Sequence, residues 1–263
     1  MPTVGLLYPG HSAEDDFRAL EVRLAAARRG TAAASFDGAV PAIRLPLVHT
    51  SVGEDAHRVD ALLDLGGQER LVHGARTLTS ANRLDSLMWA CTSGSFVFGW
   101  DGAHEQVDRL AQETGLPTSS TSIAFVNACH ALGLEKVAVA ASYPHDVAQH
   151  FVSFLGHGDV QVTSMGSHGI STAAEVGTLE KHQVTAIVVG AERAGAEAVL
   201  VPDTAMHTLA WVEDLEGAVG MPVLTANQVT VREGLRLVGP VPSLPGLGAL
   251  FASSGRASLE ATR

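Results

Sequence analysis

The sequence predicts an α/β protein built on parallel sheets. Short apolar runs of strand length alternate with helical patterns along most of the 263 residues. Polar residues and glycines mark the junctions between them, and two runs in the second half repeat runs in the first. Strands that alternate with helices are joined by crossover connections, which make neighbouring strands parallel.

The elements of the first half follow in a regular order. Residues 4–8 predict an apolar strand that ends at Pro9-Gly10. A helix is expected from Ser12, which lies at capping-box spacing from Asp15, to the Arg-Arg-Gly run that follows. Beyond it we expect a proline-interrupted strand at 40–48, helices at 55–65 and 68–78, a strand at 85–91 and a helix at 105–114.

The second half repeats this alternation. The expected helices are 122–132, which stops at Gly133, and 146–155, 208–219 and 230–237. The expected strands are 136–143, 160–165, 198–201 and 222–226. Residues 185–189 are β-prone, but we favour a helix over 180–192 because only a short loop separates them from the next strand. The tail after Gly239 is rich in Pro, Gly and Ser, and we expect it to pack loosely or fray.

Composition excludes several classes of function. The net charge is −11 and no run of lysine or arginine forms a basic stripe, so nucleic-acid and membrane-surface binding are not expected. The N-terminus lacks a signal-peptide pattern, and no stretch approaches the roughly 20 apolar residues of a membrane span. Two cysteines give no disulfide framework. We therefore expect a soluble, cytoplasmic protein.

The twelve histidines do not form a metal motif. The spacings H-E-x-x-H, H-x-H and C-x-x-C are missing from the sequence, so no metal site is predicted. No G-x-G-x-x-G or Walker A sequence occurs either, which makes nucleotide binding a weak hypothesis. His11 and His207 fall near the predicted cleft without an identifiable partner.

An internal repeat predicts two similar α/β lobes. "VGLLYP" at 4–9 resembles "VAASYP" at 139–144, and "LMWACTSGS" at 87–95 resembles "VLVPDTAMH" at 199–207. The second pair aligns Cys91-Thr92 with Asp203-Thr204. Each lobe would then place a reactive residue at the carboxyl end of a strand, where open α/β sheets bind ligands.

Cys91 is the first candidate for chemistry. It lies where an apolar strand gives way to Thr92, Ser93 and Gly94, whose hydroxyl and N–H groups can hold a carboxylate or an enolate oxygen. Donors beside a thiol favour its thiolate, which is a nucleophile or a proton carrier. The alternative is a buried structural thiol. We interpret Cys129, which lies among apolar residues at helical spacing, as such a core residue.

These motifs resemble those of the Asp/Glu racemase superfamily, and in particular its maleate cis-trans isomerase and arylmalonate decarboxylase branch. The motifs that carry the resemblance are "VGLLYPG", "ACTSGSF", "ASYPHDV", "GAEAVLVPDT" and "MPVLTANQVTVREGL". The resemblance implies two pseudo-symmetric Rossmann-like lobes, each a mainly parallel four-stranded sheet flanked by helices, with the active site between them. The first lobe would span 1–117, completed by 227–245, and the second 118–226, with a tail at 246–263. The resemblance also implies chemistry without cofactor or metal, and a homodimer.

The resemblance carries over to individual positions with one departure. Cys91 matches the cysteine of the first lobe, and Tyr143 matches a tyrosine that helps bind a substrate carboxylate. Ser12 falls about where maleate isomerases have an asparagine. The second-lobe position, typically Ser-Cys-Thr, reads Pro202-Asp203-Thr204 here. A mechanism that uses two cysteines is therefore not available.

Asp203 is the second candidate catalytic residue. A carboxyl with a pKa near 4 is a poor acid at neutral pH unless burial raises it, which a dry cleft would do. Asp203 would then act as a general acid or base opposite Cys91. The alternative is a helix N-cap, a position that aspartate favours. The candidate substrate-binding residues are Pro9, Ser12, Thr92, Ser93, Tyr143 and Thr204, although Thr92, Ser93 and Thr204 could be ordinary caps.

The predicted function is a cofactor-independent isomerase of maleate cis-trans isomerase type that acts on a small carboxylic or dicarboxylic acid. The Cys91 thiolate would add to a C=C bond, which becomes a single bond and can rotate before sulfur leaves. The alternatives are a decarboxylase of arylmalonate type or a racemase, both acting through an enediolate. A second alternative, suggested by the missing second cysteine, is a non-catalytic carboxylate-binding protein.

Overall fold

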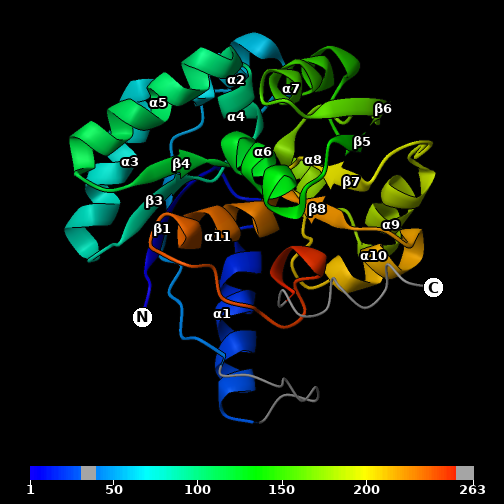
Figure 1. The fold of residues 1–263 in the computed structure, drawn as a ribbon. Coiled ribbons are helices and arrows are strands. Elements are labelled where there is room, and N and C mark those ends of the chain that lie inside the picture. The colour runs from blue at the N-terminus through cyan, green and yellow to red at the C-terminus, as the bar shows by residue number, and fades with distance from the viewer. Residues whose placement is uncertain (31–39, 253–263) are drawn as a thin grey trace.

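A computed structural model describes residues 1–30 and 40–252 (Figure 1). Eight strands form two four-stranded sheets in this part of the chain, with the orders β2-β1-β3-β4 and β6-β5-β7-β8. All neighbouring strands are parallel, and helices flank both sheets. The predicted fold class is therefore confirmed. In the described residues, no helix combines the length and the hydropathy that spanning a membrane requires.

The first sheet and its helices occupy the left half of Figure 1. Its strands are β1 (Val4–Pro9), β2 (Leu47–Thr50), β3 (Ser86–Trp89) and β4 (Thr118–Ser120). The helices in this stretch of chain are α1 (Asp15–Arg28), α2 (Val59–Leu65), α3 (Gln68–Ala81), α4 (Ser93–Phe96), α5 (Gly99–Thr114) and α6 (Thr121–Leu132). Strands β1 and β3 are almost wholly buried, because helices cover both faces of a parallel sheet.

The second sheet repeats the order of the first. Its strands are β5 (Lys136–Ala141), β6 (Gln161–Ser167), β7 (Ala198–Val201) and β8 (Val223–Thr225). The helices are α7 (His145–His157), α8 (Ala173–Gly177), α9 (Lys181–Gly190), α10 (Val212–Val219) and α11 (Ala226–Arg236). Strand β5 thus corresponds to β1, and β7 to β3, which are the two pairs of runs that the repeat aligned.

Helix α11 returns the chain from the second sheet to the first. It follows β8 directly and packs against β1, β3 and β4 as well as against helix α6. The hydroxyls of Thr121 on α6 and Thr230 on α11 lie 2.6 Å apart at this contact. The N-terminus of α11 carries a capping box in which Thr225 and Gln228 bond each other's backbone N–H groups. The last helix of the second half therefore covers the first sheet.

Several predicted elements form as expected. Helix α6 ends at Gly133, whose φ of 67° is the left-handed conformation that favours glycine at a helix C-terminus. The ambiguous stretch 180–192 contains helix α9, whose start is fixed by a capping box between Glu180 and Gln183. Cys129 lies on α6 and is fully buried, as predicted.

Other local predictions are wrong. Helix α1 begins at Asp15 with Glu14 at its N-cap, so Ser12 caps no helix. The strand expected at 40–48 is reduced to β2 at 47–50 and an isolated bridge from Arg44 to Thr3. Strand β4 and helix α8 were not expected, and α2, α5 and α11 begin several residues away from their expected starts.

The described part of the tail packs against the body of the protein instead of fraying. Four of its apolar side chains are buried in the core, namely Leu244, Leu247, Leu250 and Phe251. Residues 253–263 of the expected tail lie outside the described residues. The lobe boundaries remain a prediction, but β4 pairs with β3, so the first sheet extends three residues past position 117.

Candidate active site

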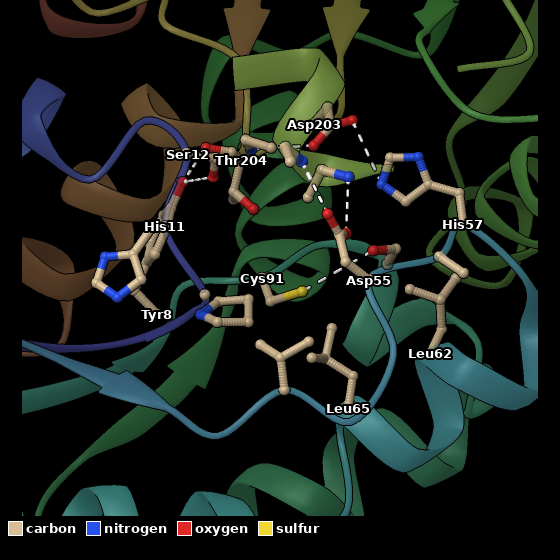
Figure 2. A pocket seen from close by; sticks show the side chains of 18 of the residues that line it. Tyr8, His11, Ser12, Asp55, His57, Leu62, Leu65, Cys91, Asp203 and Thr204 are labelled. Carbon is tan, nitrogen blue, oxygen red and sulfur yellow. Dashed lines mark hydrogen bonds and ion pairs between the residues drawn. The ribbon is translucent and has the colours of Figure 1, made fainter. Parts of the chain in front are cut away.

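The loops after β1, β3 and β7 meet around a cavity of about 180 Å³ (Figure 2). Cys91 follows β3 and Asp203 follows β7, and both side chains line this cavity. The two positions that the repeat aligned therefore face one site from different sheets. Pro9, Ser12, Ser93 and Thr204 also line it, and their role in substrate binding stays a prediction.

Cys91 lies between β3 and the short helix α4, with 3% of its surface exposed. The N–H of Gly94 donates to its Sγ at 3.3 Å, and the hydroxyl of Ser93 lies 3.9 Å from the sulfur. A Cβ at position 94 would come within 3.1 Å of Sγ and 3.0 Å of the Trp89 ring, so glycine is what lets this turn close on the thiol.

The protonation state of Cys91 differs from the prediction. Burial, with a smaller contribution from the charge of Asp203, raises the pKa of the thiol to about 12 against the lowering effect of the Gly94 and Ser93 hydrogen bonds. At neutral pH the thiol is therefore protonated in the unliganded protein. The expected resting thiolate is wrong because desolvation outweighs the nearby donors.

Asp203 is held in a fully paired geometry. The hydroxyl of Ser142 donates to its Oδ2, and the N–H of Ala205 donates to its Oδ1 at 3.0 Å. The carboxylate is 3% exposed. No helix follows it directly, since α10 begins only at Val212, so the N-cap interpretation of Asp203 is wrong.

His57 is a site residue that the sequence did not reveal. Its Nε2 lies 4.0 Å from Oδ2 of Asp203, and its ring stands edge-on to Tyr143 with centroids 4.9 Å apart. Its Nδ1 lies 2.8 Å from the carbonyl oxygen of Ile170. Because a carbonyl only accepts, Nδ1 carries a hydrogen, and in the neutral ring Nε2 presents its lone pair toward Asp203.

Tyr8 links the two sheets at the cavity wall. Its hydroxyl donates to the carbonyl of Thr204 at 2.8 Å and accepts from the N–H of Ala13 at 3.1 Å. The Ser12 hydroxyl, at 2.8 Å, completes its partners (Figure 2). Burial raises the pKa of Tyr8, so the hydroxyl stays neutral and holds the loop after β1 against the loop after β7.

Two predicted binding residues, Thr92 and Tyr143, do not line the cavity. The Tyr143 hydroxyl donates to the carbonyl of Pro202 at 2.8 Å, and burial raises its pKa well above the usual value. Thr92 is fully buried, and its Oγ1 has no hydrogen-bond partner among the described residues. In the unliganded structure this hydroxyl faces the Pro202 carbonyl and the ring packs edge-on against His57, and the contact of Tyr143 with a substrate carboxylate stays a prediction.

The rest of the wall is apolar or acidic. Leu62 and Leu65 form an apolar side of the cavity (Figure 2), and Val52 also lines it. Asp55 also reaches the wall, with both carboxylate oxygens accepting from the N–H groups of Ala173 and Ala174 at 2.9 and 3.0 Å. Among the described residues that line the cavity, none is a lysine or an arginine.

A group of metal-ligand type lies at the rim. His11, Glu14 and His49 each offer a ligand atom, and these atoms lie within 4.8 Å of one another. His11 also lines the cavity. Sequence spacing does not predict this group, because its members come from different elements.

Comparison with known proteins gives consistent matches. The family model for arylmalonate decarboxylase matches residues 66–251. The chain is 28% identical over 148 residues to the arylmalonate decarboxylase of Bordetella bronchiseptica, which is 55% of this chain and 62% of that protein. It is 27% identical over 177 residues to the maleate isomerase of Geobacillus stearothermophilus, or 65% and 70% of the two chains.

The fold is shared with solved structures over nearly the whole chain. A structure of a Nocardia farcinica maleate cis-trans isomerase mutant, with a covalently bound succinylcysteine intermediate, superposes with a TM-score of 0.80. The superposition covers 95% of this chain and 98% of the other, at 21% identity.

Proposed function

The chain belongs to the arylmalonate decarboxylase family of enzymes, and on this premise we propose that it is a cofactor-independent cis-trans isomerase of a small unsaturated dicarboxylate. The observation that carries the proposal is a cavity shared by the Cys91 thiol and the Asp203 carboxylate. The maleate isomerases among its relatives act on such an acid, and a cysteine in the Nocardia farcinica mutant bears a succinyl group. Cys91 is the cysteine of this chain that faces the cavity.

The first step is removal of the Cys91 proton. The thiol is neutral in the empty cavity, so it needs a base when the substrate binds. The carboxylate of Asp203 lies in the same cavity, with Nε2 of His57 beside it at 4.0 Å. A proton taken by this pair is shared between Oδ2 and Nε2, because Nδ1 of His57 remains bonded to the Ile170 carbonyl.

Addition and elimination then interconvert the isomers. Sγ forms a bond to one olefinic carbon, and the π electrons move toward the neighbouring carboxylate to give an enediolate. The proton held by Asp203 and His57 is delivered to the carbanionic carbon, which gives a succinyl thioether. Rotation about the new C–C single bond, return of that proton to the pair and departure of sulfur regenerate the double bond in the other geometry.

The size of the cavity supports a small substrate. A volume of about 180 Å³ is below the roughly 300–1,000 Å³ of pockets that hold drug-sized ligands. A four-carbon diacid suits this space better than an acid with an aryl substituent. The polar side of the cavity, with Ser12, Ser93 and Thr204, offers hydroxyls for carboxylate oxygens.

Proton NMR in deuterated water tests the proposal. Incubation with maleate should yield fumarate, and Cys91→Ala should abolish the reaction. Cys129→Ala is the matched control, because that thiol is buried on α6 and does not line the cavity. Unchanged turnover in Cys91→Ala, or no isomerisation by the wild-type protein, would refute the proposal.

A decarboxylase is the second candidate, and the apolar wall favours it. A carboxylate pressed against Val52, Leu62 and Leu65 loses hydration without gaining a cation, which promotes loss of carbon dioxide. The same NMR experiment with an arylmalonate would show a deuterated arylacetate. Deuterium exchange into aspartate would indicate a racemase, and tight binding without any turnover would indicate a carboxylate-binding protein.

We also propose that the protein is a cytoplasmic homodimer. The family resemblance implies the dimer, and the composition of the sequence suggests the location. Light scattering coupled to gel filtration would show a mass of about twice the 27.3 kDa chain if the dimer forms.

A further inference from the structure

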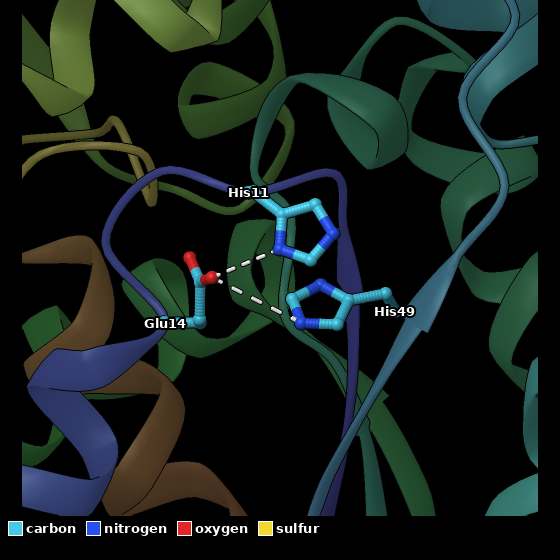
Figure 3. Close-up of side chains that lie close together, drawn as sticks. All are labelled: His11, Glu14 and His49. Carbon is cyan, nitrogen blue, oxygen red and sulfur yellow. Dashed lines mark hydrogen bonds and ion pairs between the residues drawn. The ribbon is translucent and has the colours of Figure 1, made fainter.

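We propose that His11, Glu14 and His49 form a binding site for one divalent transition-metal ion of the Zn²⁺ type at the rim of the cavity. The three side chains gather between the loop after β1 and strand β2 (Figure 3). Nδ1 of His11 lies 3.1 Å from Oε1 of Glu14, and Nε2 of His49 lies 3.9 Å from the same oxygen. Ligands bound at 2.0–2.1 Å to a tetrahedral ion are about 3.3 Å apart, so small side-chain movements would complete the geometry.

The hydrogen bonds behind His49 prepare it as a ligand. Its Nδ1 bonds the carbonyl oxygen of Gly10, which only accepts, so Nδ1 carries the hydrogen. In the neutral ring, Nε2 then presents a lone pair to the Glu14 carboxylate, which is also an acceptor. Two acceptors facing one another need a proton or a cation between them. A backbone carbonyl on the outer nitrogen is the usual support of a metal-bound histidine.

A hydrogen bond also orients the carboxylate of Glu14. Its Oε2 accepts from the N–H of Ser12 at 2.7 Å, which leaves Oε1 directed at the two imidazoles. Oε1 is therefore the oxygen that an ion bound between the two histidines would share.

The contact between the histidine rings brings two nitrogen ligands to one side of the site. Their centroids are 3.9 Å apart and their planes are inclined by 35°. One ion can accept a nitrogen from each ring. The set of two nitrogens and one carboxylate oxygen suits Zn²⁺, with a fourth position left open.

The fold holds the three ligands in place. Parallel pairing sets His49 on β2 opposite Tyr8 on β1, next to the loop that carries His11 and Glu14. Gly10 turns this loop with a φ of 64°, a left-handed conformation that favours glycine. The side chain of His11 is 76% exposed, so water and ligands reach the open side of the site.

The position of the site suggests its role, and this part rests on the proposed function. The cavity holds the carboxylates of Glu54, Asp55 and Asp203 but no lysine or arginine among its described lining residues. An ion held by His11 at the rim would add positive charge that attracts the anionic substrate, while the proposed reaction at Cys91 would proceed without it.

Metal titration tests the binding site independently of any reaction. Protein without an affinity tag is stripped with a chelator and titrated with Zn²⁺ by calorimetry, and Co²⁺ binding is followed by visible absorption. We expect one equivalent of Zn²⁺, tetrahedral Co²⁺ bands and no competition by Mg²⁺, which prefers oxygen ligands. His49→Gln and His11→Gln should each lower the Zn²⁺ affinity at least about 10-fold, the lower limit for loss of even an outer partner.

His182→Gln is the matched control, since His182 is 75% exposed and pairs with Glu180 far from the rim. The Zn²⁺ affinity of the His182→Gln variant should equal that of the wild-type protein. Absence of Zn²⁺ binding, or equal Zn²⁺ affinity in the wild-type protein and His49→Gln, would refute the proposed metal site. If Zn²⁺ binds but the KM for maleate is the same in stripped and loaded protein, the site stands and its role toward substrate is wrong. Zn²⁺ binding without any isomerisation would refute the proposed function alone.

Discussion

The pH dependence of Cys91 alkylation tests the environment of the candidate nucleophile directly. Burial places the pKa of this thiol at about 12, whereas an exposed cysteine has a pKa near 8.5. At pH 7.5 the difference leaves about 3,000-fold less thiolate on Cys91 than on an exposed cysteine. Because the thiolate is the reacting species, alkylation by iodoacetamide should be slower by about the same factor.

The assay uses a Cys129→Ala background, so that one thiol remains, and follows modification by mass spectrometry between pH 6 and 10. The rate should rise about tenfold per pH unit without a plateau, since the thiol stays mostly protonated below its pKa. Asp203→Asn removes a charge that raises the pKa of Cys91, so it should increase the rate. A plateau near pH 8, or a slower reaction in Asp203→Asn, would refute this description of the site.

Three further substitutions probe the site and its frame. His57→Gln should lower kcat by about 10²-fold, the lower range for loss of acid–base assistance, and should shift the pH–rate profile, because in the proposed mechanism His57 and Asp203, 4.0 Å apart, together hold the Cys91 proton. Asp16→Ala should lower the free energy of unfolding by about 2–5 kcal/mol in urea titrations, because its Oδ2 accepts two buried N–H groups after β7 that would lose their partner. Gly94→Ala should cost about 1–3 kcal/mol and reduce turnover, because the added methyl would crowd the Cys91 sulfur.

A specific result would contradict each of these three predictions. A normal pH–rate profile in His57→Gln with reduced kcat would leave that residue a structural role only. Asp60→Ala is the control for Asp16→Ala, because loss of its fully exposed pair with Arg58 should hardly change the free energy of unfolding. Equal losses of unfolding free energy in the two aspartate variants would contradict the stabilising role of the buried hydrogen bonds to Asp16. Full activity in Gly94→Ala would contradict the close approach of position 94 to the Cys91 thiol.

The sequence predicted the sheets because their signals are local. Apolar runs with clear stops identify β1, β3, β5 and β7, and the repeat pairs them correctly. The same repeat aligned Cys91 with Asp203, each at the carboxyl end of a strand, but only the family resemblance implied that the two sheets share one cavity. The protonation state of Cys91 was not predictable from the sequence, because it depends on how completely the surrounding side chains exclude water.

The missed residues are positioned by distant parts of the chain. His57 is fixed by backbone contacts with Ile170 and Ser171, which are more than 100 positions away. His49 meets the loop after β1 only through the pairing of β1 with β2. Ser12 follows the sequence pattern of a helix cap, but its hydroxyl bonds Tyr8, whose own position depends on the second sheet. Such contacts leave no pattern in a single sequence.

The path of helix α11 has a consequence for the protein as a whole. Because the end of the chain covers the sheet with which the chain began, neither half is a continuous segment that could be expressed alone. A ribosome must synthesise the chain through helix α11, at residues 226–236, before the first sheet has its final cover. We therefore expect truncation at residue 225 to expose apolar surface on the N-terminal half and to drive its aggregation, while the intact chain melts in one transition.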